Sequence, residues 1–265
     1  MSLLSKYGKT ALVAGASEGI GAAFATCLAK NKMNLVLIAR RIAPLETFAT
    51  TLREKYQVRV QTVSCDLSTP HAAHELIEQL TSFEIDVFVY NAGLSYIGAF
   101  EENSVEHHQQ IAFTNVVTPL NLVQYLGTQM LNRKRGAIVL MSSLAGQQGA
   151  GYLTTYGASK AFNTILGEGL WYEWKDKGVD VIACIAGATS SPNYISTQPK
   201  SIGLIKPKVQ TPEEVAQECF ANLGKQPRII TGRSNRIASF LMHRILPRKM
   251  AIKIMGDTTR KMYDV

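Results

Sequence analysis

Residues 10–30 read TALVAGASEGIGAAFATCLAK, and this stretch decides the fold. The apolar run at 10–14 predicts a short strand, and the composition of residues 22–30 predicts a helix. The glycines between them let the backbone turn tightly and approach a pyrophosphate, which the free N–H groups of the helix start would bind. Strand, glycine turn and helix in this order indicate a dinucleotide-binding site. We expect the cofactor to contact the turn at Gly15, Ser17, Glu18, Gly19, Ile20 and Gly21.

Apolar runs alternate with helical segments along most of the chain. We expect further strands at residues 34–39, 58–63, 86–90, 135–141, 179–185 and 228–232. We expect helices at residues 44–56, 69–82, 104–131 and 155–177, a kink at Pro119, and another helix start at Thr211. This alternation predicts a single-domain α/β Rossmann fold, with a doubly wound parallel sheet of about seven strands and helices on both faces.

The predicted catalytic domain covers residues 1–232, and a basic extension covers residues 233–265. Within the domain, residues 189–210 are rich in serine, proline, glycine and lysine and lack a periodic pattern, which is typical of a substrate loop. The 265 residues can bury a full core, and no change of composition marks a second domain.

The composition excludes several classes of protein. A hydrophobic content of 46% with 18% charged residues is that of an ordinary globular protein. No apolar stretch is long enough to span a membrane, and the N-terminus lacks a signal-peptide pattern. The four cysteines form no C-x-x-C pair, so we expect reduced thiols in a cytoplasmic protein. The pairs His71/His74 and His107/His108 are expected on solvent-facing helices without a third ligand, so no metal site is expected.

Two arginines follow the second predicted strand. Arg40 and Arg41 stand where dinucleotide-binding folds meet the adenosine ribose, and no acid is present there. An acid would bind the 2′-hydroxyl of NAD, whereas an arginine accepts the 2′-phosphate of NADP. The sequence therefore favours NADP(H) over NAD(H), with two solvated arginines as the alternative. The ends of the next two strands add the cofactor-binding candidates Asp66, whose carboxylate suits the adenine amino group, Leu67, Asn91, Ala92 and Gly93.

A serine, a tyrosine and a lysine form the strongest catalytic candidate. Tyr156 and Lys160 are four residues apart and share a helix face, while Ser143 follows the fifth predicted strand. This set suits proton transfer at a carbonyl or alcohol oxygen, because serine donates a hydrogen bond, tyrosine moves the proton and lysine lowers the phenol pKa. A chance spacing is the alternative, and Ser142 competes with Ser143. Asn115, in the middle of a predicted helix, also suggests a functional role.

These features together resemble the short-chain dehydrogenase/reductase family over about residues 8–232. The turn at residues 15–21 and the Asn91-Ala92-Gly93 run are similar to the cofactor motifs of that family. Its usual Pro-Gly pair appears here as Ala186-Gly187, followed by Thr189. The resemblance implies contacts to the nicotinamide end of the cofactor from Tyr156, Lys160, Gly187 and Thr189.

The resemblance also implies a role for each member of a catalytic tetrad. Tyr156 is the general acid or base, Lys160 holds the nicotinamide ribose and lowers the pKa of Tyr156, and Ser143 orients the substrate oxygen. Asn115 supports a water in a proton relay to Lys160. Family members form homodimers or homotetramers through the helices that carry these residues. Glu18 stands where members that prefer NADP often carry a basic residue, which weakens the argument from the arginines.

The net charge of +8 is placed unevenly along the chain. Residues 225–265 hold ten lysines and arginines against two aspartates, so residues 1–224 are neutral as a whole. Basic and apolar residues interleave in the extension, which indicates an amphipathic segment. We expect it to pack on the protein or on a sister subunit, and a weak peripheral contact with an anionic membrane surface is the alternative. Nucleic acid is not an expected partner, because no recognition motif occurs.

The sequence therefore predicts an NADP(H)-dependent oxidoreductase that transfers hydride between nicotinamide and a carbonyl or secondary alcohol. An apolar pocket, which favours a hydrophobic small-molecule substrate, is expected around Leu94, Tyr96, Ile97, Tyr152 and Tyr194. Two alternatives remain open: an NAD-dependent alcohol dehydrogenase, and a nucleotide-binding sensor or scaffold without turnover. Affinity for the 2′-phosphate separates the first from the main prediction, and turnover on a carbonyl panel separates the second.

Overall fold

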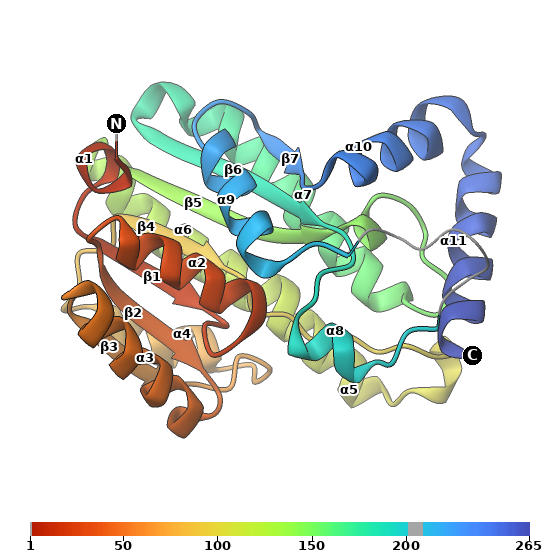
Figure 1. Cartoon of the computed structure of the whole chain (residues 1–265), viewed down its shortest axis with the longest axis horizontal. Coiled ribbons are helices and arrows are strands. Elements are labelled where there is room, and N and C mark those ends of the chain that lie inside the picture. Colours follow the sequence, from red (N-terminus) through yellow and green to blue (C-terminus); the bar gives the residue numbers. More distant parts are fainter. Residues whose placement is uncertain (1, 201–208) are drawn as a thin grey trace.

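The computed structural model describes residues 2–200 and 209–265 (Figure 1). In this part of the chain seven parallel strands form one sheet in the order β3-β2-β1-β4-β5-β6-β7. The strands are β1 Thr10–Ala14, β2 Asn34–Ala39, β3 Val60–Ser64, β4 Val87–Tyr90, β5 Gly136–Ser143, β6 Val179–Ala186 and β7 Arg228–Ile230. The winding direction reverses between β1 and β4, and in such sheets ligands bind outside the carboxyl ends of the strands at this point. The expected Rossmann architecture is confirmed.

Helices cover both faces of the sheet, as predicted (Figure 1). They are α1 Leu3–Tyr7, α2 Gly19–Lys30, α3 Ile42–Tyr56, α4 Ala72–Leu80, α5 Val105–Ala112, α6 Thr118–Arg133, α7 Thr154–Trp174, α8 Pro192–Ser196, α9 Pro212–Asn222, α10 Arg233–Phe240 and α11 Arg248–Tyr263. Phe24 and Leu45 belong to the core on the side of α2, α3 and α9. Leu76 and Leu126 belong to the core on the side of α4, α6 and α7. Burial of both faces explains why most of the strands are apolar throughout their length.

The long helix expected over residues 104–131 is irregular at a different place from the one predicted. A π-helical turn, Phe113–Val117, separates α5 from α6, and Pro119 lies in the first turn of α6 rather than at a kink. Pro119 has no N–H to donate to the Asn115 carbonyl, and the Thr118 N–H bonds the Phe113 carbonyl instead of that of Thr114, so both carbonyls lack their usual donor. Two side chains supply donors instead: the Tyr90 hydroxyl bonds the first carbonyl (2.5 Å), and the Asn163 amide bonds the second (3.0 Å).

The chain after β6 forms the rim of the site. Within the predicted substrate loop at residues 189–210, α8 is a short helix, and residues 201–208 lie outside the described residues. Helix α9 begins at Thr211 with a capping box to Glu214, as its sequence indicates. After β7 the extension forms α10, a π-helical turn at Leu241–Ile245 and α11 (Figure 1). Among the described residues, no helix is both long and apolar enough to cross a membrane.

Candidate active site

The glycine turn after β1 is pressed against the end of β4. Gly15 has a positive φ of 78°, and a side chain there would place its Cβ 2.7 Å from the Ala92 Cα. A Cβ on Gly21 would lie 1.9 Å from the Gly15 carbonyl oxygen, which also accepts a hydrogen bond from the Asn91 amide (2.9 Å). The turn therefore requires glycine for close packing, and Asn91 fixes its position. Ser17 and Ile20 complete the turn at the start of α2.

The two arginines after β2 have different surroundings. Arg41 forms an exposed ion pair with Glu18 (3.2 Å) across the glycine turn. Arg40 makes no ion pair with any described residue, and its charge acts on the nearby Asp66 carboxylate. Partial burial acts to raise the pKa of Asp66, but hydrogen bonds from Ser68 and the charge of Arg40 outweigh it and lower that pKa. Arg40 is thus the arginine free to meet a phosphate.

Residues 67, 187 and 189 hold the surrounding backbone in place. Leu67 is buried, and its carbonyl accepts a bond from the Thr118 hydroxyl (3.2 Å). The Thr189 hydroxyl donates to the Gly187 carbonyl (3.0 Å) just beyond β6. A Cβ on Gly187 would lie 2.5 Å from the Asn235 amide nitrogen, so the start of the extension packs directly against this turn.

Lys160 points into the protein from α7. Its side chain is buried, and its ammonium donates to the Met141 carbonyl of β5 (3.1 Å). Burial lowers the pKa of Lys160 to about 8, because the charged form loses its hydration. A Cβ on Gly93 would lie 3.3 Å from the Lys160 Nζ and 3.8 Å from the Asn115 Oδ1. Glycine at this position therefore leaves room between the two polar groups.

Tyr156 lies one turn before Lys160, with the ammonium 5.7 Å from the centre of its ring. Burial raises the pKa of Tyr156, a hydrogen bond with Ser143 acts to lower it, and nearby Tyr263 acts to raise it. The net direction is upward, which is opposite to the effect expected from Lys160. The physical reason is that burial disfavours the charged phenolate more than the hydrogen bond with Ser143 favours it.

Ser142 and Ser143 have separate functions in the structure. The buried Ser142 hydroxyl donates to the Lys160 carbonyl (2.7 Å) and accepts from Thr164 (2.7 Å), so it joins β5 to α7. The Ser143 hydroxyl accepts from the Ala145 N–H (3.2 Å) and retains its proton for a hydrogen bond at the site. This geometry supports Ser143 as the serine that faces a substrate.

Asn115 occupies the π-helical turn and is completely buried. Its amide clamps Leu94 from both sides, accepting from the backbone N–H (2.9 Å) and donating to the carbonyl (2.8 Å). The amide also donates to the Ser159 hydroxyl (2.8 Å). The side chain therefore fixes the loop after β4 and keeps only one acceptor position, on Oδ1 beside Gly93, for a further partner.

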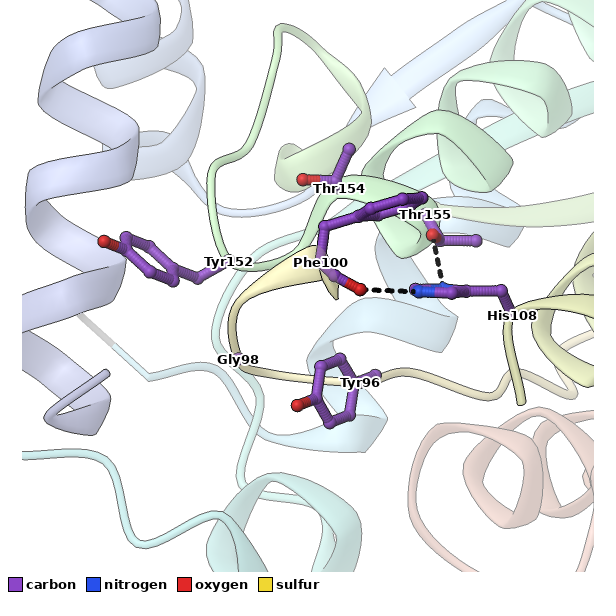
Figure 2. A pocket seen from close by; sticks show the side chains of 7 residues that line it. All are labelled: Tyr96, Gly98, Phe100, His108, Tyr152, Thr154 and Thr155. Atoms are coloured by element: carbon purple, nitrogen blue, oxygen red, sulfur yellow. Dashed lines mark hydrogen bonds between the residues drawn. The ribbon is translucent and has the colours of Figure 1, made fainter. Parts of the chain in front are cut away.

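Figure 2 shows a small pocket beside the start of α7, lined by Tyr96, Gly98, Phe100, His108, Tyr152, Thr154 and Thr155. His108 joins its walls, through Nε2 to the Phe100 carbonyl (3.1 Å) and through Nδ1 to the Thr155 hydroxyl (2.8 Å). A carbonyl can only accept, so the ring proton lies on Nε2 and Nδ1 accepts. The Tyr152 side chain points away from this contact toward α11 (Figure 2).

The C-terminal extension packs against the same region. Gln148, in the loop before α7, bonds His243 (2.8 Å). A Cβ on Gly149 would lie 3.5 Å from Ile252 of α11. Tyr263, the last residue of α11, is near enough to Tyr156 to act on its pKa. The extension is therefore part of the wall around the site, in agreement with the expectation that it packs on the protein.

Three comparisons place this architecture among known proteins. The model of the short chain dehydrogenase family matches residues 9–201. A 7β-hydroxysteroid dehydrogenase of Collinsella aerofaciens is 33% identical over 239 residues, which are 89% of this chain and 90% of that protein. The chain belongs to the short-chain dehydrogenase/reductase family. It is therefore an oxidoreductase that acts on hydroxyl or carbonyl groups with a nicotinamide cofactor.

Solved structures of family members share the fold closely. A 7β-hydroxysteroid dehydrogenase structure has a TM-score of 0.89 at 30% identity, covering 96% of this chain and 99% of its own. A short-chain dehydrogenase from Sphingobium yanoikuyae, solved in complex with NADPH, has a TM-score of 0.76 at 26% identity, covering 90% and 96%. The coverage of the first structure extends over nearly the whole chain, so its likeness is not restricted to the residues matched by the family model.

Several residues that support the site of this family member were missed by sequence reasoning. Ser159 and Asn163 lie three and seven residues after Tyr156, and their helical spacing could have revealed that they share its face. The prediction that His108 faces solvent is wrong, because it is half-buried and bonded to Thr155. No local signal identifies that contact, since the two residues are 47 positions apart.

Proposed function

We propose that this protein is an NADP(H)-dependent oxidoreductase that interconverts a carbonyl and a secondary alcohol on a hydrophobic substrate. The observation that carries the proposal is the convergence of Ser143, Tyr156 and Lys160 between β5 and α7, beside Gly93 and the glycine turn. A half-buried phenol that lies beside a serine hydroxyl and under a buried lysine ammonium is suited to moving one proton at an oxygen atom.

Each residue of the set has a role in the proposed reaction. When bound, the nicotinamide supplies the hydride for reduction or accepts it in oxidation. Tyr156 gives its hydroxyl proton to the substrate oxygen during reduction and takes one up during oxidation. Ser143 donates a hydrogen bond to the same oxygen and fixes its position. Lys160, whose pKa is lowered to about 8, holds the ribose and exchanges a proton with Tyr156 near neutral pH.

In the proposed reaction, Asn115 positions neighbouring groups and does not itself contact the substrate. It holds Leu94 and Ser159, and its remaining acceptor position lies across the space at Gly93 from the Lys160 ammonium. A water in this space would connect the two groups, which supports the proton relay implied by the resemblance.

The cofactor preference rests on Arg40. This side chain has no ion pair with a described residue, whereas Arg41 is engaged by Glu18. A hydrogen bond between arginine and a phosphate contributes about 1.5–3 kcal/mol, so we expect NADPH to bind about 10–100-fold more tightly than NADH. Substitution of Arg40→Ala should remove this preference, measured by nucleotide fluorescence during titration with each cofactor. Arg59→Ala, an exposed arginine at the opposite end of the sheet, is the matched control.

The titration also decides between the alternatives. Equal or tighter binding of NADH by the unaltered protein would contradict the NADP proposal and favour an NAD-dependent alcohol dehydrogenase. The negative charge of Glu18, beside the expected position of the 2′-phosphate, favours this second candidate. Binding of NADPH without turnover on any member of a broad carbonyl panel would instead support a sensor or scaffold.

A hydrophobic, steroid-like substrate is the class that we propose to test first. Tyr263 is close enough to both Tyr156 and Tyr194 to act on their pKa values, and the Tyr152 side chain points toward the helix that carries Tyr263, so aromatic side chains lie on this side of the site (Figure 2). The 7β-hydroxysteroid dehydrogenase relatives support this class. Oxidation of NADPH should be followed with keto-steroids and with small polar ketones in parallel. Faster turnover of the polar ketones would contradict the substrate proposal and leave the catalytic set intact.

A homodimer or homotetramer is proposed through the outer face of α7. Ile165 and Tyr172 on that face are 65% and 71% exposed. A shallow groove on it is lined by small and apolar residues and one glutamate: Ala158, Ala161, Phe162, Ile165, Leu166, Gly169, Leu170 and Glu173. Small residues allow a second helix to approach closely, and the exposed apolar side chains would gain burial from it. The active-site residues lie on the opposite side of the same helix, so subunit contact would steady them.

A further inference from the structure

The positive charge of the extension is not needed by the catalytic site. Residues 225–265 contain ten lysines and arginines against two aspartates, while the other 224 residues have no net charge. Residues 233–263 form a C-terminal arm that comprises α10, the π-helical turn and α11. In Figure 1 the arm lies at one end of the molecule, beyond the carboxyl edge of the sheet.

The arm has a buried inner side. Asn235, Ser239, Ala251 and Thr259 are buried, and they recur at helical spacing along α10 and α11. The Asn235 amide donates to the Thr231 carbonyl (2.8 Å), which anchors the start of the arm to the end of β7. These contacts fix the orientation of the arm, so its opposite side faces away from the protein.

The outer side of the arm is apolar. Ile237 is 54%, Phe240 58% and Ile245 62% exposed, although each is a residue type that is normally buried. Leu241 is 48% exposed beside them, and on α11 Met250 and Ile254, one helical turn apart, are also exposed, whereas Ile252 faces Gly149. The exposed residues of the first half, Ile237, Phe240, Leu241 and Ile245, are three, one and four positions apart, so they fall on one side of the helix and form a stripe. A contiguous exposed apolar surface of this kind indicates an interaction site.

Unpaired cations border this stripe. Among the described residues, Arg233, Arg244, Arg248, Lys249 and Lys261 form no ion pair, and all five are exposed. Residues 201–208 contain no aspartate or glutamate that could neutralise them. Asp257 is already engaged by Lys253 (2.7 Å). A second copy that used the same face would bring two positive surfaces together, which is unfavourable.

We propose that the outer face of the C-terminal arm docks on an anionic phospholipid surface. The apolar stripe would enter the boundary between headgroups and acyl chains, while the flanking arginines and lysines would meet the headgroup phosphates. Arginine and lysine also extend their charged ends from an apolar surface toward such headgroups. The inner side of the arm borders the active site, so docking would place the site beside the bilayer.

Co-sedimentation of the full-length protein with vesicles tests this proposal independently of any enzymatic reaction. We expect binding to phosphatidylcholine vesicles that contain phosphatidylserine, and at least about tenfold less binding to phosphatidylcholine alone or at high salt. Equal binding to both vesicles, or no binding to either at low salt, would overturn the proposal.

Variants identify the face that binds. Arg244→Glu with Arg248→Glu should reduce binding by at least about tenfold, because attraction becomes repulsion. Lys30→Glu with Lys55→Glu changes the net charge equally on the opposite end of the molecule and should retain binding. Phe240→Ser with Ile245→Ser should also reduce binding, with retained NADPH affinity as the measure of folding. If the control pair reduces binding as much as the arm pair, the assignment to the arm is wrong.

A second copy of the chain is the competing occupant of the arm. Sedimentation velocity across a range of protein concentrations should show the same mass for the unaltered protein and for the Phe240→Ser, Ile245→Ser variant. A loss of mass in that variant, together with an absence of vesicle binding, would assign the arm to self-association and overturn the membrane proposal.

Discussion

At the scale of single residues, burial determines the chemistry of the site. Tyr156 and Lys160 are four positions apart, and the protein shifts the pKa of each toward its neutral form. The sequence predicted both residues, because their spacing is local. It did not predict that the pKa of Tyr156 is raised, because the burial of this side chain depends on segments as distant as the end of α11. The choice between Ser142 and Ser143 likewise depends on Thr164, which only the packing of α7 brings to β5.

A consequence for stability follows from Lys160. Its pKa is about 8 in the folded protein, below the ordinary 10.5, so the unfolded state binds the proton more tightly. The folded state is therefore disfavoured below pH 8 by about 3 kcal/mol, and stability rises between pH 8 and about 10.5. We predict that Lys160→Met abolishes turnover and raises the free energy of unfolding by about 1–3 kcal/mol at neutral pH. This gain already allows for the loss of the hydrogen bond from Lys160 to the Met141 carbonyl.

Urea unfolding at several pH values measures this effect. The advantage of Lys160→Met over the unaltered protein should shrink as the pH rises above 8, since the unaltered lysine then becomes neutral. Lys30→Met, on an exposed lysine, should show no such trend. A Lys160→Met variant that is less stable at neutral pH, or whose difference is independent of pH, would contradict the account of a buried charge.

At the level of elements, the kink predicted at Pro119 is wrong: the irregularity of this helical region is a π-helical turn at Phe113–Val117. Pro119 is evident in the sequence, but its effect on the helix depends on hydrogen-bond donors from other elements. Tyr90 is 24 residues and Asn163 is 48 residues from the carbonyls that they bond. With these donors the helix tolerates the missing N–H through a π-helical turn, which buries Asn115 near Lys160. The strands and most helices were predictable, since their apolar periodicity is local.

Tyr90→Phe tests this explanation. Removal of the hydroxyl leaves the buried Thr114 carbonyl without its donor, so we expect a loss of about 1–3 kcal/mol in the free energy of unfolding. Turnover should fall as well, because Asn115 follows Thr114 in the turn. Tyr125→Phe is the control, since the half-buried hydroxyl of Tyr125 bonds no described residue. Equal stability of the two variants would show that the Tyr90 bond does not support the turn.

At the scale of the whole molecule, charge and packing separate the chain into regions with different tasks. The sheet and its helices are electrically balanced, and the positive charge is confined to the region that includes the C-terminal arm. The sequence predicted this distribution and the amphipathic pattern. It could not predict that the arm would contact Gln148 and approach Tyr156, because those contacts join residues about a hundred positions apart.

Assembly is the prediction that belongs to this scale. The exposed apolar face of α7 should bury itself against a second subunit, so sedimentation velocity should give a dimer or tetramer. Ile165→Arg should shift the protein toward a monomer, because the charge would be buried without a partner in the contact. Thr51→Arg on the exposed side of α3 should leave the mass unchanged. A monomeric unaltered protein would contradict the role assigned to this face.

We infer that Tyr156 transfers the proton in the carbonyl–alcohol conversion. The most direct measurement compares NADPH oxidation by the unaltered protein and by Tyr156→Phe on the ketone that the carbonyl panel identifies, with NADPH affinity measured in the same preparations. We predict that turnover falls by at least about 10²–10⁴-fold while NADPH affinity is unchanged. Turnover close to that of the unaltered protein in a folded Tyr156→Phe variant would contradict the account.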